Sequence, residues 1–359
     1  MLDQLHGNER AKILLRRILA TDRLPGAMLF VGEEGVGKKL FALEIARALN
    51  CRAPQAGEGC GVCPACVRIA KINYPQSAES DDWKGIIWTD HPDVGMVVAP
   101  KRLLLVEQMR QIEREANYRP YEGKARVFII DDADKLNDSS ANALLKVLEE
   151  PPETSHIILL TSRPAMLLPT IRSRCQMIRF SPLRSSEIEK HLVDNRIASP
   201  ATASIQARVA RGSLGRAIEQ DFDEYVTQRE SMLRVLKALA TGNDRTELLR
   251  SAEDLNAAPI KDEFEARLDI LETLIRDAWM LALNAPAESV VNEDLLDQLQ
   301  QVATNLDSVR PGRWISQIEE MREQLVVNIN RKASTDALFL TMAATAAADL
   351  PPKRRFLIK

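Results

Sequence analysis

The chain has 359 residues, too many for one compact core, so two or three domains are expected. Its 48 basic and 51 acidic residues leave a net charge of -3, which excludes a protein that coats nucleic acid by bulk attraction. The sequence contains neither an apolar run long enough to span a membrane nor a secretion-signal layout in "MLDQLHGNERAK", so we expect a cytoplasmic protein without membrane attachment.

The amino-terminal part predicts a helix, a strand, a glycine-rich loop and a second helix in that order. Residues 10–20 predict a helix with an apolar stripe at Ile13, Leu14, Ile18 and Leu19. Residues 24–32, "LPGAMLFVG", predict a short buried strand, and residues 38–50 predict the helix that leaves the loop. The expected element order is that of a phosphate-binding loop.

The loop itself fits the pattern G-x-x-x-x-G-K, in which glycines turn backbone N–H groups toward phosphates and the lysine reaches their outer oxygens. Its candidate nucleotide-binding residues are Gly32, Gly35, Val36, Gly37, Lys38 and Lys39. A glycine-rich turn without a ligand is the alternative. Lys39 stands where a Ser or Thr hydroxyl would hold Mg²⁺, and an ammonium cannot coordinate a cation, so hydrolysis loses one support.

Four of the five cysteines lie close together, with the spacing Cys51-x8-Cys60-x2-Cys63-x2-Cys66. In a reducing compartment this clustering favours metal over disulfides, and four thiolates suffice for a closed tetrahedral zinc site with a structural role. Four free thiols or a redox pair are the alternatives. Cys175 stands apart on an apolar strand and is interpreted as a small core residue.

Residues 51–90 lose the periodic pattern and include a polar segment, residues 73–85, that reads as an exposed insertion. Beyond it, helical spacing at 103–116 and 137–150 alternates with apolar strands at 125–130, 156–161 and 174–180. Alternation of this kind predicts an α/β fold with a doubly wound parallel sheet and a ligand site at the strand carboxyl ends.

Two acidic residues, Asp131 and Asp132, follow the first of these strands, residues 125–130, where an acid facing Mg²⁺ and a longer Glu polarising water would be expected. Aspartate is shorter than glutamate by about 1.5 Å. Slow or absent hydrolysis is therefore expected, the alternative being a merely solvated strand end.

After Pro182 no strand is predicted. Two stripes at helical spacing indicate an all-helical half: Phe264, Leu268, Leu271, Ile275 and Trp279, and Trp314, Ile318, Met321 and Leu325.

The loop, the cysteines, "HPD" at 91–93, "NALLKVLEEPP" at 142–152 and "IRSRC" at 171–175 together resemble subunits of the bacterial DNA polymerase III clamp loader, most of all the delta-prime type. The likeness is specific over residues 1–220, and "NINRKASTDALFLTM" at 328–342 resembles the closing helix of the collar domain. The resemblance implies an AAA+ α/β domain over 1–181 with a zinc module at 51–66, a helical lid over 182–220, and a helical collar over 221–359.

Carried over to this sequence, the resemblance implies that Lys38 meets the nucleotide phosphates and that Thr161 is a polar sensor at its strand end. Arg174, within Ser173-Arg174-Cys175, would project into a neighbouring subunit's ATP site as an arginine finger in trans. Three positions depart from the motor pattern: Lys39, Asp132, and Gly215 in the lid, where motor subunits carry an arginine that Arg216 reaches one position late.

We therefore expect a delta-prime-type subunit that joins gamma/tau and delta subunits in a hetero-pentamer, helps load the sliding clamp on primed DNA, and has weak or absent ATPase activity of its own. ATP or ADP with Mg²⁺ is a possible ligand, and zinc a structural one. The alternatives are an ATP-hydrolysing motor subunit of the gamma/tau type and an unrelated zinc-containing P-loop enzyme, for which no catalytic constellation is found. No DNA-binding residues are assigned, because basic residues are scattered without aromatic interleaving.

Overall fold

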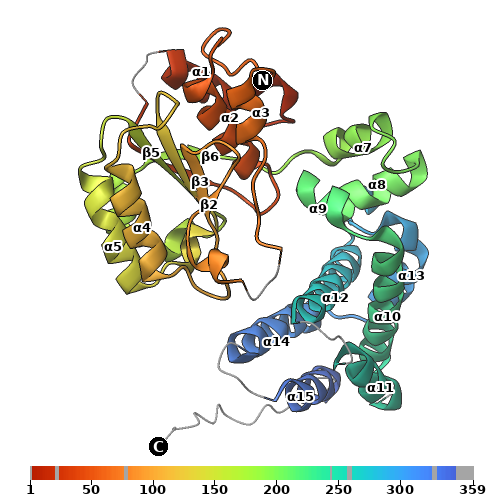
Figure 1. Ribbon diagram of the computed structural model, residues 1–359. Coiled ribbons are helices and arrows are strands. Elements are labelled where there is room, and N and C mark those ends of the chain that lie inside the picture. Colours follow the sequence, from red (N-terminus) through yellow and green to blue (C-terminus); the bar gives the residue numbers. More distant parts are fainter. Residues whose placement is uncertain are drawn as a thin grey trace, which may run out of the picture. The chain divides into compact units, whose positions relative to one another are not determined.

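A computed structural model of the chain describes residues 2–20, 24–76, 80–242, 245–256, 261–325 and 330–344. The chain divides into two compact units, Met1–Glu219 and Gln220–Lys359, and each is described by itself. Within the described ranges, no helix combines the length and the apolar character needed to cross a membrane. The first unit holds the sheet and the second is helical (Figure 1).

The first unit is built on a six-stranded sheet in the order β2-β3-β4-β5-β1-β6. All neighbours pair in parallel except β2 and β3, which are antiparallel. The strands are β1 (Ala27–Val31), β2 (Ile87–Trp88), β3 (Val94–Val97), β4 (Arg126–Ile130), β5 (Ser155–Thr161) and β6 (Gln176–Arg179). Since β1 lies between two later strands, the chain crosses over on both sides of it, and the predicted doubly wound parallel sheet is confirmed.

Helices cover both faces of this sheet, which is why β1, β4 and β5 are buried along their whole length. On one face α1 (Glu9–Ala20), α2 (Lys38–Asn50) and α3 (Pro64–Ile69) share a core with Met28 and Phe30. On the other, Leu29 and Val31 join a second core with α4 (Val106–Ala116), α5 (Asp138–Glu149) and α6 (Pro169–Arg174). Alternate residues of β1 thus serve opposite cores.

Three local predictions need correction. In α1 the buried residues are Ala11, Lys12, Leu15 and Ile18, whereas Ile13 is exposed, because the helix turns its neighbouring stripe to the sheet. Strands β2 and β3 were not predicted, since β2 has two residues and β3 contains a glycine. The aperiodic stretch at 51–90 thereby includes β2 at the edge of the sheet, and residues 77–79 of the expected insertion lie outside the described ranges.

After β6 the first unit ends in three helices with an apolar cluster of their own: α7 (Ser185–Asp194), α8 (Pro200–Val209) and α9 (Leu214–Glu219). This cluster is mostly alanine and leucine, and its members are Leu183, Ile188, Leu192, Ala203, Ala207, Ala210 and Ala217. These helices cover the segment expected to form a lid. The division into three domains at 181 and 220 stays a prediction.

The second unit contains α10 (Phe222–Thr241), α11 (Arg245–Asn256), α12 (Lys261–Ala282), α13 (Leu296–Ala303), α14 (Arg310–Leu325) and α15 (Arg331–Ala344). The predicted stripe on α12 is buried from Phe264 to Ile275, and on α14 Trp314, Ile318 and Met321 are buried, while the Leu325 side chain lies outside the described ones. Pro311 and Gly312, expected in a loop, form the first turn of α14, where proline is tolerated. No strand occurs after Pro182 among the described residues, as predicted.

Candidate nucleotide site and cysteine cluster

The glycine-rich loop connects β1 to α2 at the carboxyl edge of the sheet. Gly35 and Gly37 have φ values of 74° and 94°, a left-handed conformation that L side chains rarely adopt. Val36 between them is buried and anchors the loop to the core. The Nζ atom of Lys38 donates to the carbonyls of Gly32 and Glu33, both at 2.7 Å. The loop thus has the conformation that predicted phosphate binding requires.

Lys39 occupies the position that matters most for catalysis. Its Nζ atom lies 2.7 Å from Oδ2 of Asp131, the acid expected to face Mg²⁺, and 3.4 Å from the Tyr74 hydroxyl. Burial alone would lower the pKa of Lys39, but the adjacent Asp131 carboxylate outweighs it and holds that pKa above its ordinary value. Lys39 is therefore an ammonium at neutral pH, paired with Asp131.

Asp132, placed by sequence where a Glu would polarise the attacking water, is held by a neighbour instead. Its backbone is left-handed, with φ of 49°, and its Oδ2 atom lies 2.8 Å from Nζ of Lys135. Its amide donates to Oδ1 of Asp131 at 3.2 Å. The carboxylate predicted to act on water thus already has a cationic partner within its own turn.

Thr161, the expected sensor at the end of β5, is buried and its hydroxyl donates to Oδ1 of Asp134 at 2.7 Å. Arg163 donates to Oδ2 of the same carboxylate from Nε at 3.0 Å and Nη2 at 2.8 Å. Sequence reasoning missed Asp134 and Arg163 in this site. The available signals were the third acid of "DDAD" and an arginine two residues beyond a strand-ending threonine.

Helix α9, the last of the three helices that follow β6, lies directly against the phosphate loop. The amide of Gly215 donates to the Gly35 carbonyl at 3.2 Å, and Ser213 Oγ lies 1.9 Å from where a Cβ on Gly35 would stand. Arg216, one position after Gly215, is exposed, and its backbone N–H donates to Ser213 Oγ at 3.1 Å. Gly35 is therefore required by close approach as well as by its backbone angle.

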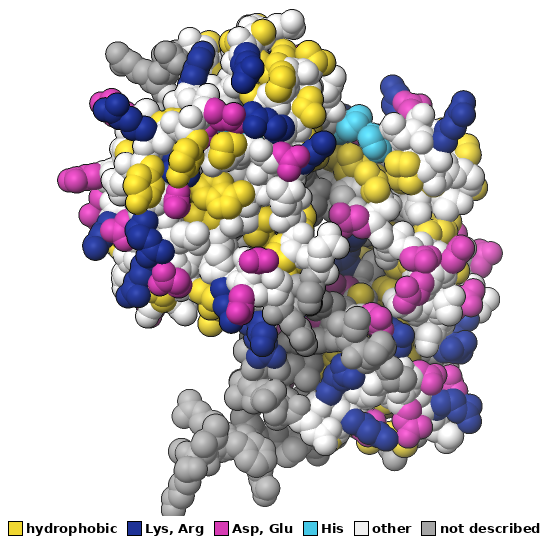
Figure 2. All heavy atoms as spheres, in the orientation of Figure 1, with side chains coloured by type: hydrophobic (Ala, Val, Ile, Leu, Met, Phe, Trp, Pro, Cys, Tyr) yellow, Lys and Arg dark blue, Asp and Glu magenta, His cyan; other side chains and the backbone are white. Residues whose placement is uncertain are grey.

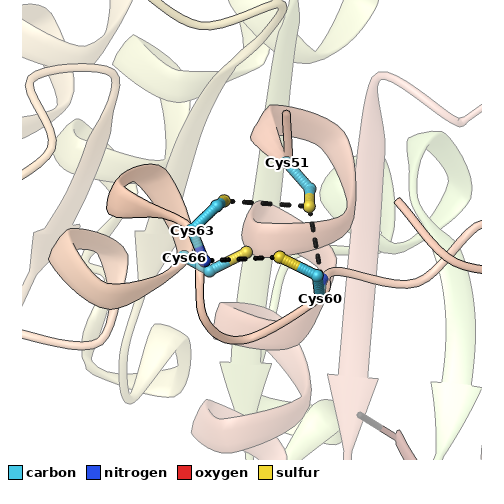
Figure 3. Close-up of side chains that lie close together, drawn as sticks. All are labelled: Cys51, Cys60, Cys63 and Cys66. Carbon is cyan, nitrogen blue, oxygen red and sulfur yellow. Dashed lines mark hydrogen bonds between the residues drawn. The ribbon is translucent and has the colours of Figure 1, made fainter. Parts of the chain in front are cut away.

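The four clustered cysteines converge at the far end of α2 (Figure 3). Cys51 follows the last residue of α2, Cys63 precedes α3, Cys66 lies within α3, and Gly61, with φ of 75°, forms the turn after Cys60. Their sulfurs lie within 4.8 Å of one another, and that of Cys51 is 3.9 Å from that of Cys63. Tetrahedral zinc thiolates imply sulfur separations of about 3.8 Å, so this donor set fits a metal ion.

Backbone amides already point at these sulfurs. The N–H groups of Ala53 and Cys60 donate to Cys51 Sγ at 3.4 and 3.2 Å, and that of Cys63 donates to Cys60 Sγ at 3.3 Å. Such bonds favour thiolates, the form that binds metal. Cys175, by contrast, is buried among apolar residues, and burial raises the pKa of its thiol to about 12. The prediction that Cys175 is a core residue is confirmed.

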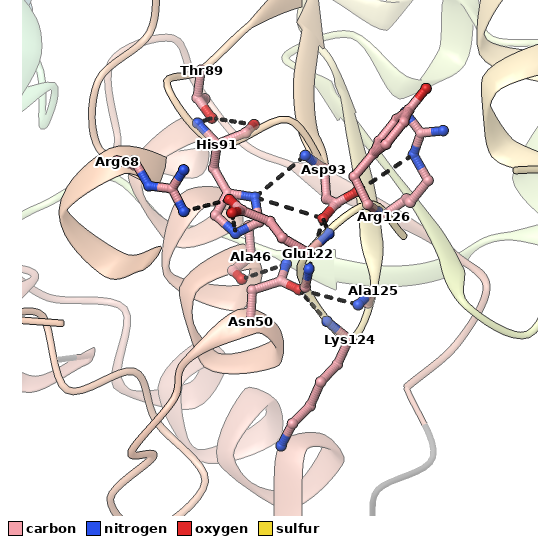
Figure 4. Close-up of polar contacts among 12 residues, drawn as sticks. Ala46, Asn50, Arg68, Thr89, His91, Asp93, Glu122, Lys124, Ala125 and Arg126 are labelled. Atoms are coloured by element: carbon pink, nitrogen blue, oxygen red, sulfur yellow. Dashed lines mark hydrogen bonds and ion pairs between the residues drawn. The ribbon is translucent and has the colours of Figure 1, made fainter. Parts of the chain in front are cut away.

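A polar network around His91 and Asp93 reaches α3 through the ion pair between Arg68 and Glu122 (Figure 4). The Asp93 carboxylate accepts from the amides of Tyr121, Glu122 and Gly123 at 2.7 to 3.0 Å. The Asp93 amide donates to Nδ1 of His91 at 3.3 Å, so the other ring nitrogen, 3.4 Å from Glu122, carries the proton. Burial lowers the pKa of His91. The "HPD" segment is thus a structural junction.

Arg174 is the last residue of α6, and its guanidinium is exposed. Nη2 lies 2.8 Å from a carboxylate oxygen of Glu149, the last residue of α5, and Nη1 donates to the Thr170 carbonyl at 3.0 Å. Arg174 therefore lies away from the loop residues in every contact the structure records. A role at this chain's own nucleotide site receives no support from these contacts.

A parallel sheet with its loop strand between later strands, a glycine loop at the carboxyl edge and helices against that loop define a P-loop protein of the AAA+ type. Sequence models described as "DNA polymerase III, delta subunit" and "DNA polymerase III, delta subunit, C terminal" match residues 7–184 and 223–338. The chain belongs to this DNA polymerase III delta and delta-prime family.

Individual relatives agree with this placement. The chain is 27% identical to DNA polymerase III subunit delta′ of Bacillus subtilis over 93% of this chain and 95% of the relative. It is 29% identical to that of Escherichia coli over 88% of this chain and 87% of the relative. Subunit tau of Escherichia coli is 34% identical, but the match covers 59% of this chain and 31% of tau. Of these three relatives, the two delta′ subunits are matched over most of their length and tau over less than a third.

Solved structures include a gamma subunit-related DNA polymerase III protein of Thermotoga maritima. It shows a TM-score of 0.43 at 19% identity, covering 92% of this chain and 99% of that one. The Bacillus subtilis clamp loader delta protein shows a TM-score of 0.30 at 12% identity, covering 92% of this chain and 98% of that one.

Proposed function

We propose that the chain is the delta-prime-type member of a DNA polymerase III clamp loader, acting as a non-motor ring component. It lends Arg174 to a neighbouring ATP site and contributes its helical second unit to assembly. The observation that carries the non-motor part is the 2.7 Å contact between Lys39 and Asp131, because it places an ammonium on the acid that a motor subunit uses for Mg²⁺.

A gamma/tau-type motor is the second candidate, favoured only by the identity of 34% over the first part of the chain. Three features oppose it. Lys39 replaces the metal-binding hydroxyl, Asp132 is held by Lys135, and the lid presents Gly215 to the loop where a sensing arginine would be needed. A site with these features retains little capacity to stabilise the transferring phosphate.

The proposed partners are gamma/tau and delta subunits in a hetero-pentamer, with the sliding clamp and primed DNA reached through the assembly. The names of the relatives support membership in a clamp loader. The hetero-pentameric composition of that complex is proposed together with it. On the face drawn in Figure 2, Lys and Arg side chains are interspersed with Asp and Glu. That pattern favours local phosphate contacts over a broad basic surface.

We also propose that the metal at Cys51, Cys60, Cys63 and Cys66 is zinc in a structural role. Four thiolates leave no open coordination position for a reacting group. The cluster would fix the loop between α2 and α3 as well as α3 itself, which joins the hydrophobic core of the first unit through Ile69.

Arg174→Ala in the reconstituted loader tests the finger. A finger supplied in trans is worth about 10³ to 10⁵ at one site, so hydrolysis at that site should nearly cease and ATP hydrolysis by the assembly should fall by at least that site's share, while this chain stays folded. Arg179→Ala, which removes an exposed arginine on β6, is the matched control. Glu149→Gln removes the partner of Arg174 within the chain and should leave hydrolysis intact. Unchanged hydrolysis in Arg174→Ala would contradict the role.

A further inference from the structure

The loop and its surroundings fit phosphates but not a divalent cation. Different residues are responsible for these two properties. For phosphates, Gly35 and Gly37 hold the left-handed angles that turn amides inward, and these amides lie at the start of a 13-residue helix. Lys38 adds an ammonium bonded to the loop's own carbonyls, partners that an incoming phosphate oxygen can replace.

A divalent cation meets a different environment. Mg²⁺ needs near-octahedral oxygen ligands, commonly one or two carboxylates with substrate phosphates. Here the hydroxyl ligand is absent, and the acid that would remain, Asp131, has the Lys39 ammonium 2.7 Å from its Oδ2 atom. Its other oxygen accepts the Asp132 amide. A cation at Asp131 would have to displace Lys39 and would then face a like charge.

The expected insertion, residues 73–85, supplies a second contact to Lys39 in addition to that with Asp131. Tyr74 places its hydroxyl 3.4 Å from Nζ of Lys39, which lies 5.9 Å from the centroid of the Tyr74 ring. The hydroxyl donates onward to Met96 Sδ at 3.7 Å, and the ring stacks on Trp83 with centroids 6.2 Å apart. Lys39 is thus enclosed between Asp131 and Tyr74.

We propose that the Lys39 ammonium is a built-in substitute for the divalent cation, so that this pocket binds the phosphates of a nucleoside di- or triphosphate without Mg²⁺. Lys38 and Lys39 together supply two fixed positive charges beside the loop amides. Neither can be released or exchanged, and neither supplies the coordination that positions water or leaving group. This inference concerns the chain's own pocket and is independent of the role proposed for Arg174.

Equilibrium binding of ADP and ATP to the isolated full chain tests it, by calorimetry in excess Mg²⁺ and again in EDTA. For the native chain we expect dissociation constants that agree within about threefold between the two conditions. A tenfold or greater tightening by Mg²⁺ would overturn the proposal. Absence of binding at millimolar nucleotide in both conditions would overturn it as well.

Substitutions at one position supply the matched comparison. Lys39→Thr restores the hydroxyl and frees Asp131, so its nucleotide affinity should rise at least tenfold when Mg²⁺ replaces EDTA. Lys39→Met keeps the length without charge or hydroxyl and should bind at least tenfold more weakly than the native chain in both conditions. A Lys39→Thr protein indifferent to Mg²⁺ would show that Lys39 does not stand in the metal's place.

Paramagnetic resonance with Mn²⁺ gives a readout that does not depend on affinity. With nucleotide present, the native chain should not change the Mn²⁺ signal, because Mn²⁺ does not bind the protein. Lys39→Thr should instead show the signal of a protein-bound Mn²⁺–nucleotide complex. Protein-bound Mn²⁺ in the native chain would contradict the proposal. Because no partner subunit takes part, these results are separable from those of the Arg174 experiment.

Discussion

The two ends of α2 differ in whether the ionisable side chains around them have charged partners within the chain. Near its beginning, residues expected to act on nucleotide already have partners within the chain: Lys39 pairs with Asp131, Asp132 with Lys135, and Thr161 with Asp134. At its other end, four thiols face one another and receive only backbone amides. The first region supplies its cations from the chain, whereas the second offers a donor set that could hold a cation from outside. A motif should therefore be judged by whether its groups still lack partners.

The largest expected effect comes from breaking the thiol region. Cys66→Ser removes a buried ligand, so we expect loss of the metal and a fall of several kcal/mol in the free energy of unfolding of the first unit, because metal binding and folding are linked. Elemental analysis and urea unfolding measure both. Cys175→Ala is the control and should keep one zinc per chain. Full metal content in Cys66→Ser would refute the assignment.

The next largest effect concerns the polar network around Asp93. Asp93→Ala removes a fully buried carboxylate that accepts from three backbone amides, those of Tyr121, Glu122 and Gly123, and we expect a loss of about 3 kcal/mol in unfolding free energy. Asp93→Asn, which can still accept hydrogen bonds through its amide oxygen, should lose less. Denaturant titration of the three proteins measures the difference. Equal stability of Asp93→Ala and the native chain would contradict a structural role for the network.

A smaller effect is expected where α9 meets the loop. Gly35→Ala places a Cβ 1.9 Å from Ser213 Oγ and holds alanine at positive φ, so we expect about 2 kcal/mol of destabilisation. Ser213→Gly in the same chain removes the clash but not the backbone strain, and should restore about half of the loss. Thermal unfolding compares the single and double variants. No recovery in the double variant would assign the whole cost to the backbone.

The smallest expected effect is the pH dependence of stability near neutrality. Burial lowers the pKa of His156 against the opposing effect of its bond to the Pro25 carbonyl, and burial likewise lowers the pKa values of His91 and His191. The unfolded chain then binds more protons than the folded one below about pH 6.5, so stability should fall as the pH drops from 7 to 5. His156→Gln should flatten that slope. A slope unchanged in His156→Gln would exclude its contribution.

Sequence was a good guide where signals are local. Continuous apolar runs located β1, β4 and β5. The thiol spacing also predicted the cluster that the structure brings together. Each of these depends on residues a few positions apart.

What sequence could not give depends on distant partners. Lys39 was recognised as a substitution that removes a ligand, but its pairing with Asp131 requires β1 and β4 to bring their carboxyl ends to the same edge. Tyr74 contacts Lys39 only because the strands β2 and β3, too short to predict, fold the intervening segment back along the sheet. Asp134 and Thr161 lie 27 positions apart and meet because they follow and end the neighbouring strands β4 and β5.

The helix α2 starts at the loop and ends at Cys51, so a single rigid rod of about 20 Å links the two regions. A metal at Cys51 would fix the far end of that rod and thereby set the direction in which its first amides face. Stripping the metal would then let the rod pivot, and nucleotide would be held less firmly by a chain whose phosphate loop had not been touched.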